Sequence, residues 1–186
     1  MLEFQKGNVP AFETLMRKYY ARILNFSYRF VGDRDTAEDL AQEVFIKVHR
    51  SGSSYRPQAK FQTWIYTIAK NLSLNAVRSM KRQAVSLDQD VDGEDGAMQR
   101  QLADPKAEHP AQVLQRQETA VIVQEAVNSL PENQKLAVIL RRYERLSYEA
   151  IAETMGCSPE AVKSLLNRAK ENLKVKLSHL LHMPDK

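Results

Sequence analysis

Residues 148–167 read YEAIAETMGCSPEAVKSLLN and carry the pattern of two helices that cross at a tight turn. Ala152 is small where the helices would approach closely, and Gly156 can supply the positive φ of the turn. Ser158 suits the N-cap of the second helix, followed by Pro159 as its first residue and Glu160 near its positive dipole end. Three apolar residues are expected to fill the shared core: Ile151, Val162 and Leu165. The segment therefore predicts a helix-turn-helix.

The second of these helices has one apolar side and one polar side. At about 100° per residue, the apolar stripe comprises Val162, Leu165, Leu166, Ala169 and Leu173. The opposite side suits a DNA major groove, because Lys and Arg donate to guanine or phosphate, Asn pairs with adenine and Glu accepts from cytosine. A solvated helix face would carry similar charges, and the complete pattern with its glycine turn is what favours DNA. The predicted DNA-reading residues are Ser158, Glu160, Lys163, Ser164, Asn167 and Arg168.

A helix over residues 33–50, DRDTAEDLAQEVFIKVHR, is expected to have Asp33 as its N-cap. Its buried stripe comprises Ala37, Leu40, Ala41, Val44 and Val48. Ile46 points away from that stripe into a polar setting formed by Asp35, Asp39, Gln42 and Glu43. An apolar residue in such a setting indicates a protein-docking patch, although a single exposed isoleucine is also common on monomers.

A further helix is expected from about residue 60 to residue 82, after the loop SGSSYRPQAK. Phe61, Trp64, Ile65, Ile68 and Leu72 form its core stripe, so Trp64 is interpreted as a core residue. Basic, amide and aromatic groups lie beside this stripe and in the loop, and such groups hold unstacked bases of single-stranded DNA. The predicted contacts to single-stranded DNA are Tyr55, Arg56, Lys60, Thr67, Asn71 and Arg78.

The distribution of charge divides the chain. Seven acidic and two basic residues lie within residues 83–112, so the remaining residues carry about nine positive charges although the net charge is only +4. Apolar periodicity also disappears there, which predicts an acidic flexible linker. We expect an all-α fold with helical domains at residues 1–82 and 111–186, joined by a linker at residues 83–110.

The apolar content bounds the class of protein. The longest apolar run, residues 136–140, is far shorter than the roughly 18 residues of a membrane-spanning helix. No signal-peptide core opens the chain, and its one cysteine, Cys157, excludes an internal disulfide. We expect a cytoplasmic protein without direct membrane insertion.

Four strings in order resemble the extracytoplasmic-function (ECF) sigma factors of the sigma-70 family: FQKGNVPAFETLMRKYY, DTAEDLAQEVFIKVHR, FQTWIYTIAKN and LSYEAIAETMGCSPEAVKSLLNRAK. The resemblance implies a sigma region 2 domain in the first block and a region 4 domain in the second. It implies that Asp39, Gln42 and Glu43 dock onto the β′ clamp helices of core RNA polymerase. Tyr55 and Asn71 would hold a flipped base of the minus-ten element.

The same resemblance places Lys163, Ser164 and Arg168 on the minus-thirty-five element of promoter DNA. It places Leu136 and Ile139 near the polymerase β-flap, where they are also candidates for simple core residues. A dedicated anti-sigma factor is a further implied partner. Many relatives carry arginine where this chain has Leu165, so their upstream sequence preference does not transfer.

Two other classes of function explain less of the sequence. A stand-alone dimeric helix-turn-helix regulator would bind duplex DNA tightly without polymerase, but it leaves the Asp39 and Glu43 surface unexplained. An enzyme is disfavoured because no phosphate-binding loop or metal-ligand spacing appears. The four histidines, His49, His109, His179 and His182, are scattered or terminal. We expect no catalysis, no cofactor and no metal site.

Overall fold

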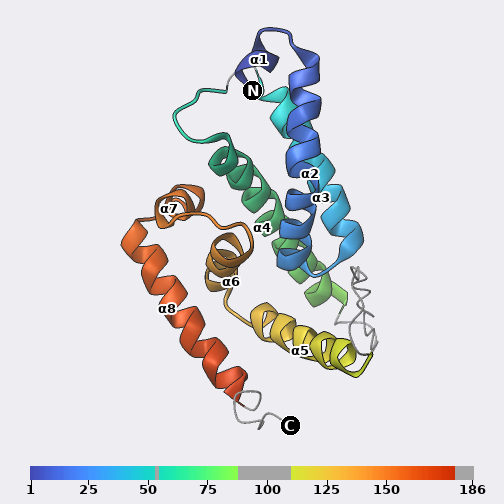
Figure 1. Ribbon diagram of the computed structural model, residues 1–186, viewed down its shortest axis with the longest axis vertical. Coiled ribbons are helices and arrows are strands. Elements are labelled where there is room, and N and C mark those ends of the chain that lie inside the picture. Colours follow the sequence, from blue (N-terminus) through green and yellow to red (C-terminus); the bar gives the residue numbers. More distant parts are fainter. Residues whose placement is uncertain (53–54, 88–109, 179–186) are drawn as a thin grey trace.

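The computed structural model describes residues 1–52, 55–87 and 110–178 (Figure 1). These residues form helices and turns with no strand among them, which confirms the predicted all-α fold. Helix α4 continues past the expected end at residue 82, and most of the predicted linker lies outside the described residues. The elements are α1 (Leu2–Gln5), α2 (Val9–Val31), α3 (Arg34–Arg50), α4 (Phe61–Leu87), α5 (Pro110–Asn128), α6 (Glu132–Val138), η2 (Ile139–Tyr143), α7 (Tyr148–Met155) and α8 (Pro159–Lys176).

Helices α2, α3 and α4 pack against one another as the N-terminal domain (Figure 1). Their apolar residues recur at helical spacing, so the buried sides meet at Ile23, Val44 and Ile65, all fully buried. Asp33 caps α3 as expected, accepting a hydrogen bond from the backbone N–H of Thr36 at 2.7 Å. Hydrogen bonds from Thr36 also lower the pKa of Asp33.

The C-terminal domain contains the predicted helix-turn-helix, formed by α7 and α8. Gly156 ends α7 with a φ of 71°, in the left-handed region that glycine enters without strain. Ser158 caps α8, since its side chain accepts from the backbone N–H of Ala161 at 3.2 Å. Ile151 and Val162 are fully buried. The turn chemistry read from the sequence therefore matches the observed geometry.

Between α6 and α7 the helix widens at η2. The backbone N–H of Glu144 donates to the carbonyl of Ile139, five residues earlier, at 3.2 Å. The N–H of Leu146 reaches back to the carbonyl of Leu140 at 3.1 Å, and Arg145 between them adopts a positive φ of 56°. Such π-type widening interrupts the regular helix. It accompanies the burial of the Glu144 side chain.

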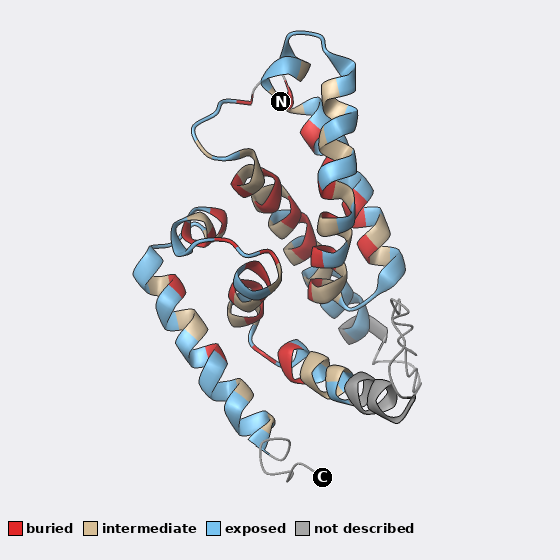
Figure 2. Ribbon diagram, in the orientation of Figure 1, coloured by how far each residue is buried: buried red, intermediate tan, exposed pale blue. Residues whose placement is uncertain are grey.

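The two domains pack together, with α7 against α4 and η2 against α2 (Figure 1). Buried apolar residues from both form one continuous cluster, which includes Ile65 and Leu72 of α4 as well as Leu146 and Ile151 of the C-terminal domain. Figure 2 shows that α8 is, by contrast, exposed along most of its length. The domains therefore share a core while the second helix of the helix-turn-helix remains accessible.

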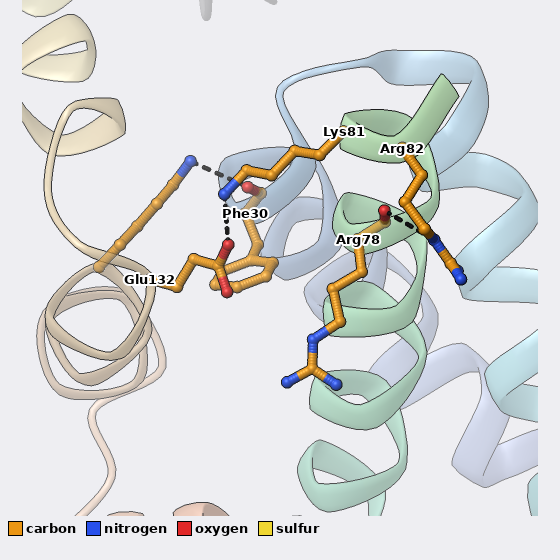
Figure 3. Close-up of polar contacts among 6 residues, drawn as sticks. Phe30, Arg78, Lys81, Arg82 and Glu132 are labelled. Atoms are coloured by element: carbon orange, nitrogen blue, oxygen red, sulfur yellow. Dashed lines mark hydrogen bonds and ion pairs between the residues drawn. The ribbon is translucent and has the colours of Figure 1, made fainter. Parts of the chain in front are cut away.

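Polar groups cross the same interface. The Nζ of Lys135 in α6 donates to the backbone carbonyl of Phe30 at the end of α2, at 2.9 Å, and the lysine is buried. Closer to solvent, Lys81 of α4 and Glu132 of α6 form an ion pair with a separation of 2.5 Å (Figure 3). An exposed pair of this kind contributes little to stability, so the buried contacts dominate the polar part of the interface.

Candidate nucleic-acid interface

Helix α8 presents the predicted DNA-reading side to solvent. Its apolar stripe holds it in place, with Val162 and Ala169 buried and Leu165 partly buried, as the helical projection predicts. The side chain of Asn172 donates to Gln134 of α6 at 2.8 Å, which ties the C-terminal half of α8 to its own domain. The exposed predicted residues are Ser158, Glu160, Lys163, Ser164, Asn167 and Arg168.

The first turn of α8 contains an acidic residue, Glu160. The pKa of Glu160 is lowered by backbone and Ser158 hydrogen bonds. This places a carboxylate at the positive end of the helix dipole. The Ser158 hydroxyl already accepts the capping hydrogen bond from Ala161, so Ser158 has a structural task in addition to any contact with DNA.

A second polar stripe lies on α4. Thr67, Asn71 and Arg78 are spaced four and seven residues apart, which at about 3.6 residues per turn places them on one side of the helix. Asn71 and Arg78 are exposed, and so is Lys60 just before the helix. The Thr67 hydroxyl donates back to the carbonyl of Thr63 at 2.9 Å. The structure thus brings the predicted α4 residues together on one side.

The loop that precedes α4 presents its residues unequally. Arg56 is exposed, but the Tyr55 ring is only 7% exposed and packs against Trp64 at a centroid distance of 4.8 Å. Burial raises the pKa of the Tyr55 phenol. Trp64 is itself half-buried against the core, which agrees with its interpretation as a core residue. In this conformation the Tyr55 ring already packs against two aromatic partners, Phe61 and Trp64.

A third surface lies on α3. Ile46 is 48% exposed, as the sequence predicts, and every polar residue expected around it is exposed as well. Glu43 and Lys47 approach to 3.7 Å, one turn apart. The surface therefore combines an accessible apolar side chain with an acidic and amide setting, formed by Asp35, Asp39, Gln42 and Glu43.

The sequence did not predict the residues that join the two domains. Tyr66 and Glu144 are buried and hydrogen-bonded to each other, with Arg22 beside them, while Lys135 bonds the end of α2. Tyr66 directly follows Ile65 of the core stripe of α4, and Glu144 lies within a polar run that reads as surface. Neither position carries a periodic signal that would indicate its partner.

Metal sites and membrane-spanning helices are two further kinds of feature that the described residues could carry. Within residues 1–52, 55–87 and 110–178, no group of three or more His, Cys, Asp and Glu side chains is arranged to hold a metal ion. His49 lies against the rings of Phe4 and Phe12, whereas His109, His179 and His182 are outside the described residues. None of the helices in the described part of the chain has the length and apolar character to cross a membrane.

The sequence of this chain is similar to those of known proteins. Family models match the chain at residues 15–83, described as Sigma-70 region 2, and at residues 120–173, described as Sigma-70, region 4. The chain is 37% identical to the RNA polymerase sigma-H factor of Pseudomonas aeruginosa over 178 residues, which cover 95% of this chain and 91% of the relative. It is 35% identical to the ECF RNA polymerase sigma-E factor of Haemophilus influenzae over 181 residues, covering 95% and 93%.

A solved structure shares the fold. The sigma factor RpoE from Bartonella quintana, in complex with the anti-sigma factor NepR, aligns with a TM-score of 0.70 and 22% sequence identity. The alignment covers 91% of this chain and 98% of that chain. The α3 and α4 surfaces lie within the first matched region, and the polar side of α8 lies within the second.

Proposed function

The chain belongs to the ECF sigma factors of the sigma-70 family, and we propose how its surfaces divide the work of promoter recognition. Residues 1–82 bind core RNA polymerase and capture the melted minus-ten element. Residues 111–186 read the minus-thirty-five element as duplex DNA, and residues 83–110 link the two. The observation that carries this proposal is the presence of two accessible DNA-type surfaces, on α4 and α8, in separate domains of one chain.

Polymerase docking is assigned to α3. Asp35, Asp39, Gln42, Glu43 and Ile46 form its accessible surface. A central apolar side chain within a polar rim is the usual anatomy of a protein interface. The clamp helices of the β′ subunit are the proposed partner of this surface. The β-flap is proposed to contact α6 and η2 near Leu136 and Ile139, although both side chains are buried in this arrangement.

Minus-ten capture is assigned to the α4 stripe and its loop, with Asn71 and Arg78 as exposed contacts and Tyr55 entering from the loop. A flipped base loses its stacking, and hydrogen bonds or ring contacts from the protein offset that loss. The upstream duplex is assigned to α8, whose Lys163, Asn167 and Arg168 are exposed for groove and phosphate contacts. We propose that the protein performs no catalysis and acts in the cytoplasm.

An anti-sigma factor is the second proposed partner. The structural relative from Bartonella quintana was solved in complex with one. By analogy, a protein that covers the α3 and α4 surfaces would prevent both polymerase docking and strand capture.

Run-off transcription tests the proposal. Core polymerase is supplied with promoter fragments from the host genome, with and without the chain, and new specific transcripts are expected only when the chain is present. The double variant Asp39→Ala/Glu43→Ala should abolish them by weakening polymerase binding. The matched control Glu13→Ala/Glu153→Ala removes two exposed acids from α2 and α7 and should retain them. Tight binding of duplex DNA by the chain alone, without transcripts, would instead support the stand-alone dimeric regulator.

A further inference from the structure

The side chain of Gln5 joins the N-terminal helix α1 to the loop before α4. Its Nε2 donates to the backbone carbonyl of Gly52 at 2.6 Å and to that of Tyr55 at 2.9 Å. The N–H of Tyr55 also donates to the Gly52 carbonyl, at 3.3 Å. One side-chain amide therefore joins the backbone carbonyls of Gly52 and Tyr55, about 50 residues away in sequence. Both bonds are partly buried, where an unpaired donor or acceptor is costly.

Gly52 receives a second contact from the same helix. Phe4 lies so close to it that a β-carbon added at Gly52 would come within 2.7 Å of the phenylalanine ring. The ring of Phe4 is held in turn by Phe12 of α2, at a centroid distance of 5.0 Å, and by His49 of α3, at 5.2 Å. Gly52 thus packs against a cluster of aromatic rings. Only glycine, which has no β-carbon, allows its backbone to lie this close to the Phe4 ring.

Tyr55 connects this contact to the start of α4. The Tyr55 carbonyl accepts from Gln5 and also from Nη1 of Arg56, at 3.2 Å. The Tyr55 ring packs on Phe61 and Trp64 at the start of α4. A displacement of the Tyr55 backbone would therefore move Tyr55 and Arg56 relative to the α4 stripe.

We propose that Gln5 is a positioning residue for minus-ten capture, fixing the backbone carbonyls of Gly52 and Tyr55 and thereby the position of residues 55–60 relative to the α4 stripe. The inference rests on the proposed function. A loop whose backbone is already fixed loses less freedom when a base is bound. Gln5 acts through these two carbonyls and does not itself touch DNA.

The matched change is Gln5→Glu, which keeps the shape of the side chain but replaces both amide donors with acceptors facing two carbonyls. The measurement is the affinity of the holoenzyme for the single non-template strand of a promoter identified by run-off transcription. We expect about ten-fold weaker binding with unchanged affinity for core polymerase. Lys6→Gln is the control, because the Lys6 side chain pairs with Glu3 at 2.8 Å. Gly52→Ala, which forces the Phe4 ring away, should reproduce the selective loss.

Three outcomes would overturn the inference. Equal losses of strand and polymerase affinity in Gln5→Glu and Gly52→Ala would give the contact a merely structural role. Full strand affinity in both variants, with a loss in Asn71→Ala, would refute the positioning role and leave the proposed function standing. Full strand affinity in all three variants would refute the positioning role and also the proposal that this surface captures the minus-ten element.

Discussion

Tyr66 of α4 donates its hydroxyl hydrogen to the carboxylate of Glu144, across the interface between the two domains. Glu144 is only 4% exposed, and Nε of Arg22 lies 3.6 Å from the same carboxylate. Burial, followed by the nearby Glu144 charge, raises the pKa of Tyr66. A buried carboxylate loses its hydration, and a hydrogen-bond donor and a nearby positive charge compensate for that loss. Because the partners come from α2 and α4, the contact favours one particular docking of the domains.

This docking conflicts with the proposed reading of both promoter elements at once. Elements centred about 25 base pairs apart are separated by about 85 Å of duplex, at 3.4 Å per base pair. In the described structure α7 contacts α4 directly. We therefore expect the interface to open when the chain engages polymerase and promoter, and its buried polar groups regain water when it does.

Replacing the phenol should weaken the docked arrangement. Tyr66→Phe removes the hydrogen bond to a charged acceptor, and we expect the free energy of unfolding to fall by about 1.5–3 kcal/mol. Urea unfolding measures this loss, and small-angle scattering should show a larger radius of gyration. Tyr148→Phe, at an exposed tyrosine, is the control. Comparison with Glu144→Gln and with the double variant isolates the interaction free energy between Tyr66 and Glu144. Additive losses would show that the two side chains are energetically independent.

Lys135 makes stability depend on pH in a defined direction. Burial lowers the pKa of this amine from its ordinary value of 10.5 to about 8. Between these values the unfolded chain binds more protons than the folded chain, so the free energy of unfolding should rise with pH. Relative to Lys135→Met, the wild type should gain at most about 2 kcal/mol between pH 8 and pH 9.5. Parallel pH profiles for the two proteins would contradict a suppressed charge at this site.

Asn71 should act on strand capture alone. Asn71→Ala removes an exposed amide, so we expect roughly ten-fold less promoter opening and near-normal polymerase binding. Permanganate reactivity of unpaired thymines reports the opening. Asn128→Ala is the control, because it removes an exposed amide at the end of α5, outside the surfaces assigned to DNA. An equal fall in polymerase binding would give Asn71 a structural role.

Lys163 should act on the upstream duplex. Lys163→Glu reverses an exposed charge on α8 and should weaken holoenzyme binding to the minus-thirty-five element, with a salt slope smaller by about 1 if a phosphate contact is lost. Lys176→Glu makes the same charge change in the last turn of α8 and should have less effect. Unchanged promoter preference with Lys163→Glu would exclude the proposed orientation of α8 on DNA.

Local chemistry explains why much of the fold was predictable. Two helix caps and one left-handed turn involve only residues close together in sequence, so the neighbouring residues suffice to identify them. They are the N-caps Asp33 and Ser158 and the turn at Gly156. Helical spacing likewise identified the exposed face around Ile46. Tyr55 differs, because its burial depends on Trp64 and Phe61, whose positions follow from tertiary packing.

The sequence by itself determined the all-α class, the helix-turn-helix and the polar sides of α3, α4 and α8, because periodicity and capping are local properties. Only the tertiary structure decided that Glu144 meets Tyr66, that Lys135 reaches Phe30 and that Gln5 bonds Gly52 before α4. These contacts join residues from 47 to 105 positions apart. A single polar residue carries no periodicity that identifies its partner, so the choice is made when apolar surfaces pack and bring the two groups together.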